Sequence, residues 1–235
     1  MMIIAHRAPV FATNTLLLAA GPGAPAVLVD PGAGVADAVR QTLAQHDLTI
    51  GAVVLTHGHA DHLWDCAELA GPAPVHIGAD DADRLADPAR HLGPALIAAF
   101  ADDVGPWQQP SNVVAVGEGY ELEVGSLRLT ATAAPGHTPG STVWRLDGDL
   151  ELVGAAFAEV GLAAHQGPLV LTGDVLFAGS IGRCDLPGGD EQRMAATLRR
   201  LSSTIPTDAV LVPGHGPATT MARELATNPF LAQMR

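Results

Sequence analysis

Lysine is absent from this 235-residue chain, whose 12 basic residues are all arginine. They face 25 acidic residues, so the formal net charge at pH 7 is −13. A protein that follows the phosphate backbone of a nucleic acid needs a positively charged surface. Two bound divalent cations would still leave this chain strongly negative. The charge therefore argues against a nucleic-acid partner.

Cysteine is also scarce, with Cys66 and Cys184 the only two. Two cysteines are too few for a disulfide framework, so we expect free thiols in a reduced cytoplasm, dispensable for chemistry. The N-terminus shows no basic region followed by a long apolar run, and no signal peptide is expected. No segment approaches the ~18 consecutive apolar residues of a membrane span, so no membrane partner is expected either.

Aromatic residues make up only 4% of the chain although 48% of it is hydrophobic, so alanine, valine and leucine must fill the core. Short apolar runs and turn signals recur after about residue 113 without a strong linker, which is consistent with two αβ halves. For the apolar excursion at 147–167, a dimer contact, a flap over the substrate and a plain insertion stay open. The strands are predicted at 15–18, 26–29, 53–56, 74–77, 113–116, 120–124, 127–130, 142–146, 169–173 and 210–213, and the helical segments at 35–46, 62–69, 80–112, 191–203 and 219–226.

Three histidines and an aspartate follow the apolar run 53–55 with single-residue gaps. The run is typical of a buried strand, and open α/β sheets place their ligand sites at the carboxyl ends of such strands. His57 and His59 are two apart, so an extended segment points both the same way. Asp61 and His62 approach them if a helix follows. Imidazole nitrogen and carboxylate oxygen suit zinc, manganese or iron.

Three further strand ends carry donor side chains. His137 lies between Pro-Gly and Thr-Pro-Gly on a tight loop, Asp174 follows the run 169–173, and His215 follows the run 210–213. A single fold would have to bring these ends to the first cluster. Asp30 also ends a predicted strand, where a simple turn cap is the alternative to a functional role.

The H-x-H-x-D-H pattern at 57–62, joined by Asp30-Pro31-Gly32, His137, Asp174 and His215, resembles the signature of the metallo-β-lactamase-fold hydrolases. Residues 175–190 and the Asn-Pro-Phe-Leu tail at 228–231 are similar to the glyoxalase II-like (hydroxyacylglutathione hydrolase-like) branch. The resemblance implies an α/β fold: a four-layer αββα sandwich spanning residues 1–235 as one domain of two αβ halves. Cys184 departs from the Thr usual in that branch, and Asp65 from the Gly usual in the family.

The resemblance also implies a site with two divalent metal ions, zinc first, with iron or manganese as alternatives. It assigns one metal to three histidines, the other to a mixed triad, and one carboxylate to a bridge between them. Asp30 would lie beneath the metals and orient a ligand imidazole. The implied ligands are His57, His59 and His137 for the first metal, Asp61, His62 and His215 for the second, and Asp174 for the bridge.

The implied reaction is hydrolysis of a thioester by a hydroxide held between the metals, with Asp61 or Asp174 assisting proton movement. The implied substrate is an S-(2-hydroxyacyl)glutathione or a similar low-molecular-weight thiol conjugate. A mononuclear-iron persulfide dioxygenase, a lactone hydrolase and a metal-bearing interaction protein are the alternatives. The C-terminal helical domain with which longer relatives grip glutathione is not expected here, so the thiol stays open.

Arg183 lies nine residues after Asp174 in a Gly-rich loop, and it is the candidate substrate-binding cation. An arginine can hold a carboxylate through two parallel hydrogen bonds. An internal salt bridge to Asp185 or Asp190 is the alternative. A monomer and a homodimer are both compatible with the sequence.

Overall fold

The computed structural model describes residues 1–88, 91, 98, 100, 102 and 104–233. The first half of the chain contributes β1 (Met2–Arg7), β2 (Asn14–Ala19), β3 (Pro25–Val29), α1 (Ala36–Gln45), β4 (Thr49–Val54), α2 (Ala60–Leu63), α3 (Cys66–Ala70), β5 (Val75–Gly78), the 3-10 helix η1 (Ala79–Leu85) and β6 (Val113–Val116). The second half contributes β7 (Glu121–Val124), β8 (Leu127–Ala133), β9 (Thr142–Gly154), α6 (Ala155–Ala158), β10 (Ala164–Gly173), β11 (Leu176–Phe177), β12 (Ser180–Ile181), α7 (Glu191–Thr204), β13 (Val210–Pro213), β14 (Thr219–Thr220), α8 (Met221–Thr227) and α9 (Pro229–Ala232).

Strands β1 to β6 lie side by side in chain order. The first three pair antiparallel, whereas β3, β4, β5 and β6 run parallel to one another. The carboxyl ends of parallel strands meet at one edge of a sheet. Asp30 after β3 and the 57–62 cluster after β4 therefore emerge at the same edge.

The second half of the chain builds the strand order β7, β8, β9, β10, β13, β14. Because β10 and β13 run parallel, Asp174 and His215 also emerge at a common edge. The long strand β9 links the halves: its first residues pair with β8, and its last residues, Glu151–Gly154, pair with Met2–Ala5 of β1.

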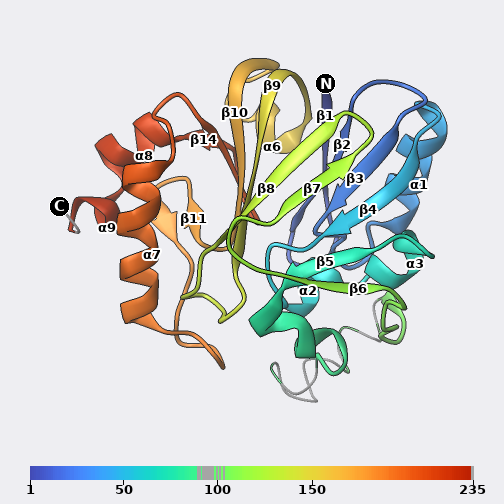
Figure 1. Ribbon diagram of the computed structural model, residues 1–235, viewed down its shortest axis with the longest axis horizontal. Coiled ribbons are helices and arrows are strands. Elements are labelled where there is room, and N and C mark those ends of the chain that lie inside the picture. Colours follow the sequence, from blue (N-terminus) through green and yellow to red (C-terminus); the bar gives the residue numbers. More distant parts are fainter. Residues whose placement is uncertain (89–90, 92–97, 99, 101, 103, 234–235) are drawn as a thin grey trace.

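Successive side chains of a strand point to opposite faces, so the central strands contribute to several of the four hydrophobic clusters formed by the described residues. Leu16 and Leu18 of β2 point into a core shared by both sheets, whereas Leu17 between them packs with α1, α2 and α3. On the second sheet, Val170 and Leu211 face a third core formed with α7, α8 and α9. Figure 1 shows α1 and α3 on one outer side of the molecule and α7, α8 and α9 on the opposite side. The predicted four-layer αββα sandwich is confirmed.

Most predicted elements exist, with differences at their boundaries. The helix predicted at 62–69 is wrong as a single unit: α2 begins at Ala60, and a turn at Trp64 and Asp65 separates it from α3. The helix predicted at 219–226 begins instead as the short strand β14 before α8. Strand β1 was not predicted. Within the segment predicted to be helical at 80–112, residues 89–90, 92–97, 99, 101 and 103 lie outside the described residues.

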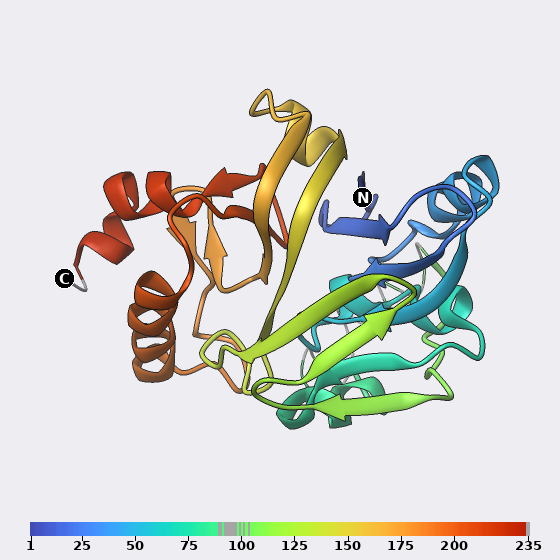
Figure 2. The ribbon, with the colours of Figure 1, turned by 45° about the horizontal axis from the view of Figure 1, so that its top comes forward.

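Residues 147–167 form the distal part of a long hairpin: β9 continues to Gly154, α6 follows, and β10 returns from Ala164. Figure 2 shows β9 and β10 extending together beyond the rest of the second sheet, with α6 near their tip. The pairing of β9 with β1 gives this insertion a structural role, because it joins strands from the two halves.

Among the helices of the described residues, none is both long and apolar enough to cross a membrane.

Trp144 on β9 is completely buried in the core between the sheets, and its Nε1 donates to Leu55 O at 3.4 Å. We expect Trp144→Ala to lower the free energy of unfolding by about 3–5 kcal/mol, because the substitution leaves a large cavity. Urea denaturation measures this change. Val153→Ala on the same strand, where the side chain is exposed, is the matched control and should stay near the wild-type value. Equal effects of the two substitutions would contradict the packing role of Trp144.

Candidate metal centre

The three histidines predicted for the first metal converge on one point. His57 follows β4, His59 precedes α2 in an extended conformation, and His137 comes from the loop after β8. Nδ1 of His59 lies 3.0 Å from Nε2 of His57 and 2.9 Å from Nε2 of His137. All three rings are buried. A neutral imidazole has one N–H and one lone pair, so three facing nitrogens cannot all satisfy one another through hydrogen bonds. A cation between them would do so.

The mixed triad predicted for the second metal is also assembled. His62 Nε2 lies 3.2 Å from His215 Nε2, and Asp61 Oδ2 lies 3.2 Å from that same nitrogen of His215. His62 Nε2 is 3.5 Å from Asp61 Oδ2. Two neighbouring positions of α2 and the loop after β13 thus supply an oxygen and two nitrogens at one place.

Asp174 lies between the two triads. Its Oδ1 is 3.5 Å from His62 Nε2, and its Oδ2 is 3.7 Å from His137 Nε2. Oδ1 is buried and accepts no hydrogen bond from the described residues. A buried oxygen without a hydrogen bond is costly unless something else satisfies it. The donor set therefore fits two cations with a shared carboxylate, and its metal-binding role stays a prediction.

Asp30 joins the two triads from below. Its Oδ2 lies 2.9 Å from His62 Nδ1 and accepts the Thr56 hydroxyl at 2.6 Å, while Oδ1 accepts the Thr56 N–H at 2.7 Å. The Thr56 hydroxyl in turn lies 3.1 Å from His57 Nδ1. These contacts hold the outer nitrogens and leave Nε2 of each ring directed at the centre. Thr56 was missed in the sequence analysis, because a Thr ending a strand carries no distinctive signal.

Two other ligand rings are held by backbone carbonyls. His137 Nδ1 lies 2.8 Å from Arg183 O, and His215 Nδ1 lies 2.9 Å from Phe11 O. Thr13 in the β1–β2 loop donates its hydroxyl to Asp61 Oδ2 at 3.2 Å. The loop contacts of Phe11 and Thr13 were not predicted either, since only the tertiary structure brings that loop to the site.

The protonation of the rings differs between the triads. Burial lowers the pKa of His57, His59 and His137, and the neighbouring imidazoles lower the first two further. Burial also acts to lower the pKa of His62, but Asp61 and other carboxylates outweigh it and raise that pKa to about 10. Metals bind neutral imidazole. The first triad is therefore ready for a cation at pH 7, whereas a cation at the second triad must displace a proton from His62.

Arg183 is exposed, and its guanidinium forms a two-pronged ion pair with Asp185, with Nε–Oδ1 and Nη2–Oδ2 distances of 2.7 Å each. This is the internal salt bridge that the sequence analysis left open. An exposed ion pair contributes little to stability. The contact of its carbonyl with His137 nevertheless gives residue 183 a place in the architecture of the site.

A depression of about 470 Å³ opens onto both triads. Apolar side chains of Phe11, Phe177, Ile181 and Leu186 form much of its wall, and Arg183 is the one guanidinium among its described lining residues. None of residues 147–167 lines this depression. The segment therefore makes no contact there of the kind that a flap over the substrate would make. The dimer-contact alternative stays a prediction.

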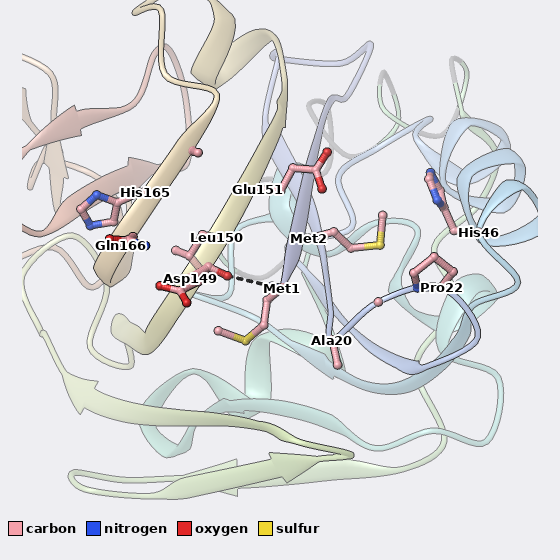
Figure 3. A pocket seen from close by; sticks show the side chains of 12 residues that line it. Met1, Met2, Ala20, Pro22, His46, Asp149, Leu150, Glu151, His165 and Gln166 are labelled. Atoms are coloured by element: carbon pink, nitrogen blue, oxygen red, sulfur yellow. Dashed lines mark hydrogen bonds between the residues drawn. The ribbon is translucent and has the colours of Figure 1, made fainter.

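A larger depression, of about 660 Å³, lies beside the N-terminus (Figure 3). The Met1 ammonium donates to Asp149 O at 2.7 Å along one wall. Figure 3 shows His46 next to α1 and His165 on β10, on opposite sides of β1. None of the seven predicted donors lines this depression. Its histidines do not converge on one another, so the predicted donors gather at the other depression only.

The geometry agrees with comparisons to known proteins. The family model of the metallo-beta-lactamase superfamily matches residues 8–149, which is more than half of the chain. The chain belongs to this superfamily.

An uncharacterized protein of Mycobacterium tuberculosis is 33% identical over 234 residues, covering 98% of each chain. The hydroxyacylglutathione hydrolase GloC of Haemophilus influenzae is 31% identical over 210 residues, covering 88% of this chain and 87% of that protein. Among solved structures, TTHA1623 in a di-iron-bound form has a TM-score of 0.72 and 30% identity, covering 97% of this chain and 100% of that chain. These relatives support a metallo-hydrolase and do not determine the metal.

The buried carboxylate of Asp30 is expected to control metal affinity. Asn has nearly the same shape and tolerates the left-handed backbone of this position (φ 43°), so Asp30→Asn should fold. It loses the charge that faces His62 Nδ1, and groups that orient metal-binding imidazoles are typically worth about 10–100-fold in affinity. Zinc titration of the metal-free protein against a chelating indicator measures the loss.

Asp65→Asn is the matched control, because Asp65 is also buried but accepts from Ala36 N at 2.9 Å, on α1. An Asp30→Asn protein that binds zinc as tightly as wild type would show that the ring of His62 needs no such support.

Proposed function

We propose that this chain is a dinuclear metal-dependent hydrolase that cleaves a thioester. The observation that carries the proposal is the position of Asp174 between two complete triads, with distances of 3.5–3.7 Å to histidines of both. A structural metal site is closed to reactants, whereas donors of both triads line a depression through which a substrate could reach bound metals.

When bound, two divalent ions would supply a water of lowered pKa and polarise the carbonyl oxygen of the substrate. The chain itself supplies the proton transfers. Burial would raise the pKa of Asp61, but His62 and His215 outweigh it and lower that pKa, so Asp61 stays ionised. Burial raises the pKa of Asp174. Both carboxylates lie beside the depression and would be the chain's groups nearest to a proton released there.

The features of the depression support a small thioester as substrate. A thiolate is a good leaving group, and no cysteine or serine is needed as a nucleophile. The apolar wall at Phe11, Phe177 and Ile181 offers contact to an acyl chain or to the stem of a thiol. Similarity to a hydroxyacylglutathione hydrolase favours S-(2-hydroxyacyl)glutathione or a related thiol conjugate.

Two measurements separate this function from its alternatives. The metal content of protein purified without added metal should be two ions per chain, of zinc, iron or manganese. The same preparation should hydrolyse S-lactoylglutathione or another acyl thioester faster than a lactone. One iron per chain, together with oxygen uptake on a persulfide, would replace this proposal with a persulfide dioxygenase.

Asp174→Ala is expected to abolish hydrolysis and to release one metal with little loss of fold. The shared carboxylate would offset the repulsion between two neighbouring cations, and its removal would leave that repulsion uncompensated. Elemental analysis and circular dichroism of the variant test both parts. Retention of two tightly held metals by the folded variant would contradict the bridging role.

Arg183→Ala separates substrate contact from loop organisation. A substrate contact made equally in the ground and transition states raises KM and spares kcat, whereas loss of loop organisation lowers kcat and Tm together. Cys184→Thr in the same loop is the control and should keep most activity, since Thr is usual there in the branch this chain resembles. If Arg183→Ala keeps wild-type KM, kcat and Tm, neither role holds.

A further inference from the structure

One pair of oppositely charged residues outside the predicted donor set is almost completely buried. Asp81 and Arg84 both lie on η1, three residues apart, and their relative exposures are 0% and 2%. The Nε of Arg84 lies 3.1 Å from Oδ1 of Asp81. Taking two charges out of water is costly, and a buried pair is weak evidence for stability by itself. Because stability alone does not explain why this pair is buried, its contacts with the neighbouring candidate metal centre have to be considered.

Asp81 connects the two loops that carry the first triad. Its Oδ2 accepts the N–H of Gly58 at 2.8 Å and the hydroxyl of Thr138 at 2.6 Å. Its Oδ1 accepts the N–H of Gly140 at 2.9 Å, in addition to facing Arg84. Gly58 stands between His57 and His59, and Thr138 directly follows His137. One carboxylate thus holds the loop from the first half of the chain against the loop from the second.

Arg84 extends the connection to a third loop. Its Nη2 donates to the carbonyl of Pro187 at 3.0 Å, in the loop that carries Arg183 and its contact with His137. Its stem fills the space beside Gly58, where an added Cβ would lie 2.4 Å from Cδ of Arg84. Any residue other than glycine at position 58 would therefore require the Arg84 side chain to move.

We propose that the Asp81–Arg84 pair is the positioning device of the first metal site, which fixes the mutual geometry of His57, His59 and His137 for a divalent cation. This inference rests on the metal centre of the proposed function. The second triad is held by other groups: Asp30 on His62, Thr13 on Asp61 and the Phe11 carbonyl on His215. The effect of the pair is therefore specific to one site.

The test isolates each site in turn. The substitution His215→Ala disables the second triad and leaves the first intact. The substitution His59→Ala disables the first triad and leaves the second intact. Asp81→Asn is introduced into each, and Zn²⁺ alone is titrated into the metal-free proteins against a chelating indicator. We expect about a 10–100-fold loss of Zn²⁺ affinity in the His215→Ala background, the range typical of groups that orient ligands. In the His59→Ala background the affinity should not change.

Glu224→Gln is the matched control. Glu224 is as buried as Asp81 and accepts the Gly179 N–H at 2.8 Å and the Thr219 hydroxyl at 2.6 Å, away from all seven donors. If Asp81→Asn does not fold, Asp81→Asn/Arg84→Met replaces it, because removal of both charges leaves no lone buried charge.

Equal loss at both sites, or no loss at either, would overturn the inference. So would failure of the double variant to fold while Glu224→Gln folds, since the pair would then support the whole fold rather than one site. Failure of the proposed function is seen separately. An otherwise unaltered chain that binds fewer than two Zn²⁺ ions would contradict the dinuclear proposal, while the effect of Asp81→Asn on the remaining site would still test the pair.

Discussion

The meeting of imidazole nitrogens and carboxylates at the shared edge of two sheets is the constraint on which this structure depends. Within the first triad, nitrogens approach to 2.9–3.0 Å in a buried environment. Such a cluster has too few protons to satisfy itself and is shielded from water. Two of its rings are held from outside, His57 by the Thr56 hydroxyl and His137 by the Arg183 carbonyl, whereas Nε2 of His59 has no hydrogen-bond partner among the described residues. In the second triad, Asp30 holds His62 and the Phe11 carbonyl holds His215.

These outer contacts come from both halves of the chain, so the site depends on how the halves are joined. Strand β9 joins them at the far end by pairing with β8, β10 and β1. The Asp81–Arg84 pair joins them beside the candidate metals through the loops at Gly58, Gly140 and Pro187. The contact also requires a glycine in one of these loops. A Cβ at Gly140 would lie 2.5 Å from the Asp81 backbone nitrogen, so a larger residue there would push η1 away.

The two triads differ electrostatically although they share Asp174. Burial lowers the pKa of His57 and His59, whereas the neighbouring carboxylates outweigh burial and raise the pKa of His62. Cation binding at the second triad is therefore coupled to proton release, and binding at the first triad near pH 7 is not. One fold can carry varied chemistries, so the function has to be argued from such properties of the site.

Local pattern predicted most of the strands and the candidate cluster at 57–62, whereas the layered architecture and the assignment of seven donors followed from the resemblance to a known family. The continuous apolar run 53–55 indicates a strand buried on both faces, and the short spacing from His57 to His62 indicates a ligand cluster at its end. The supports of those donors could not be predicted, because Thr13, Thr56, Asp81 and Arg84 act through partners distant in the chain or through contacts without a motif. Their roles were decided by the tertiary structure, since hydrogen bonds from Gly58, Thr138 and Gly140 meet one carboxylate only after the two halves have packed together.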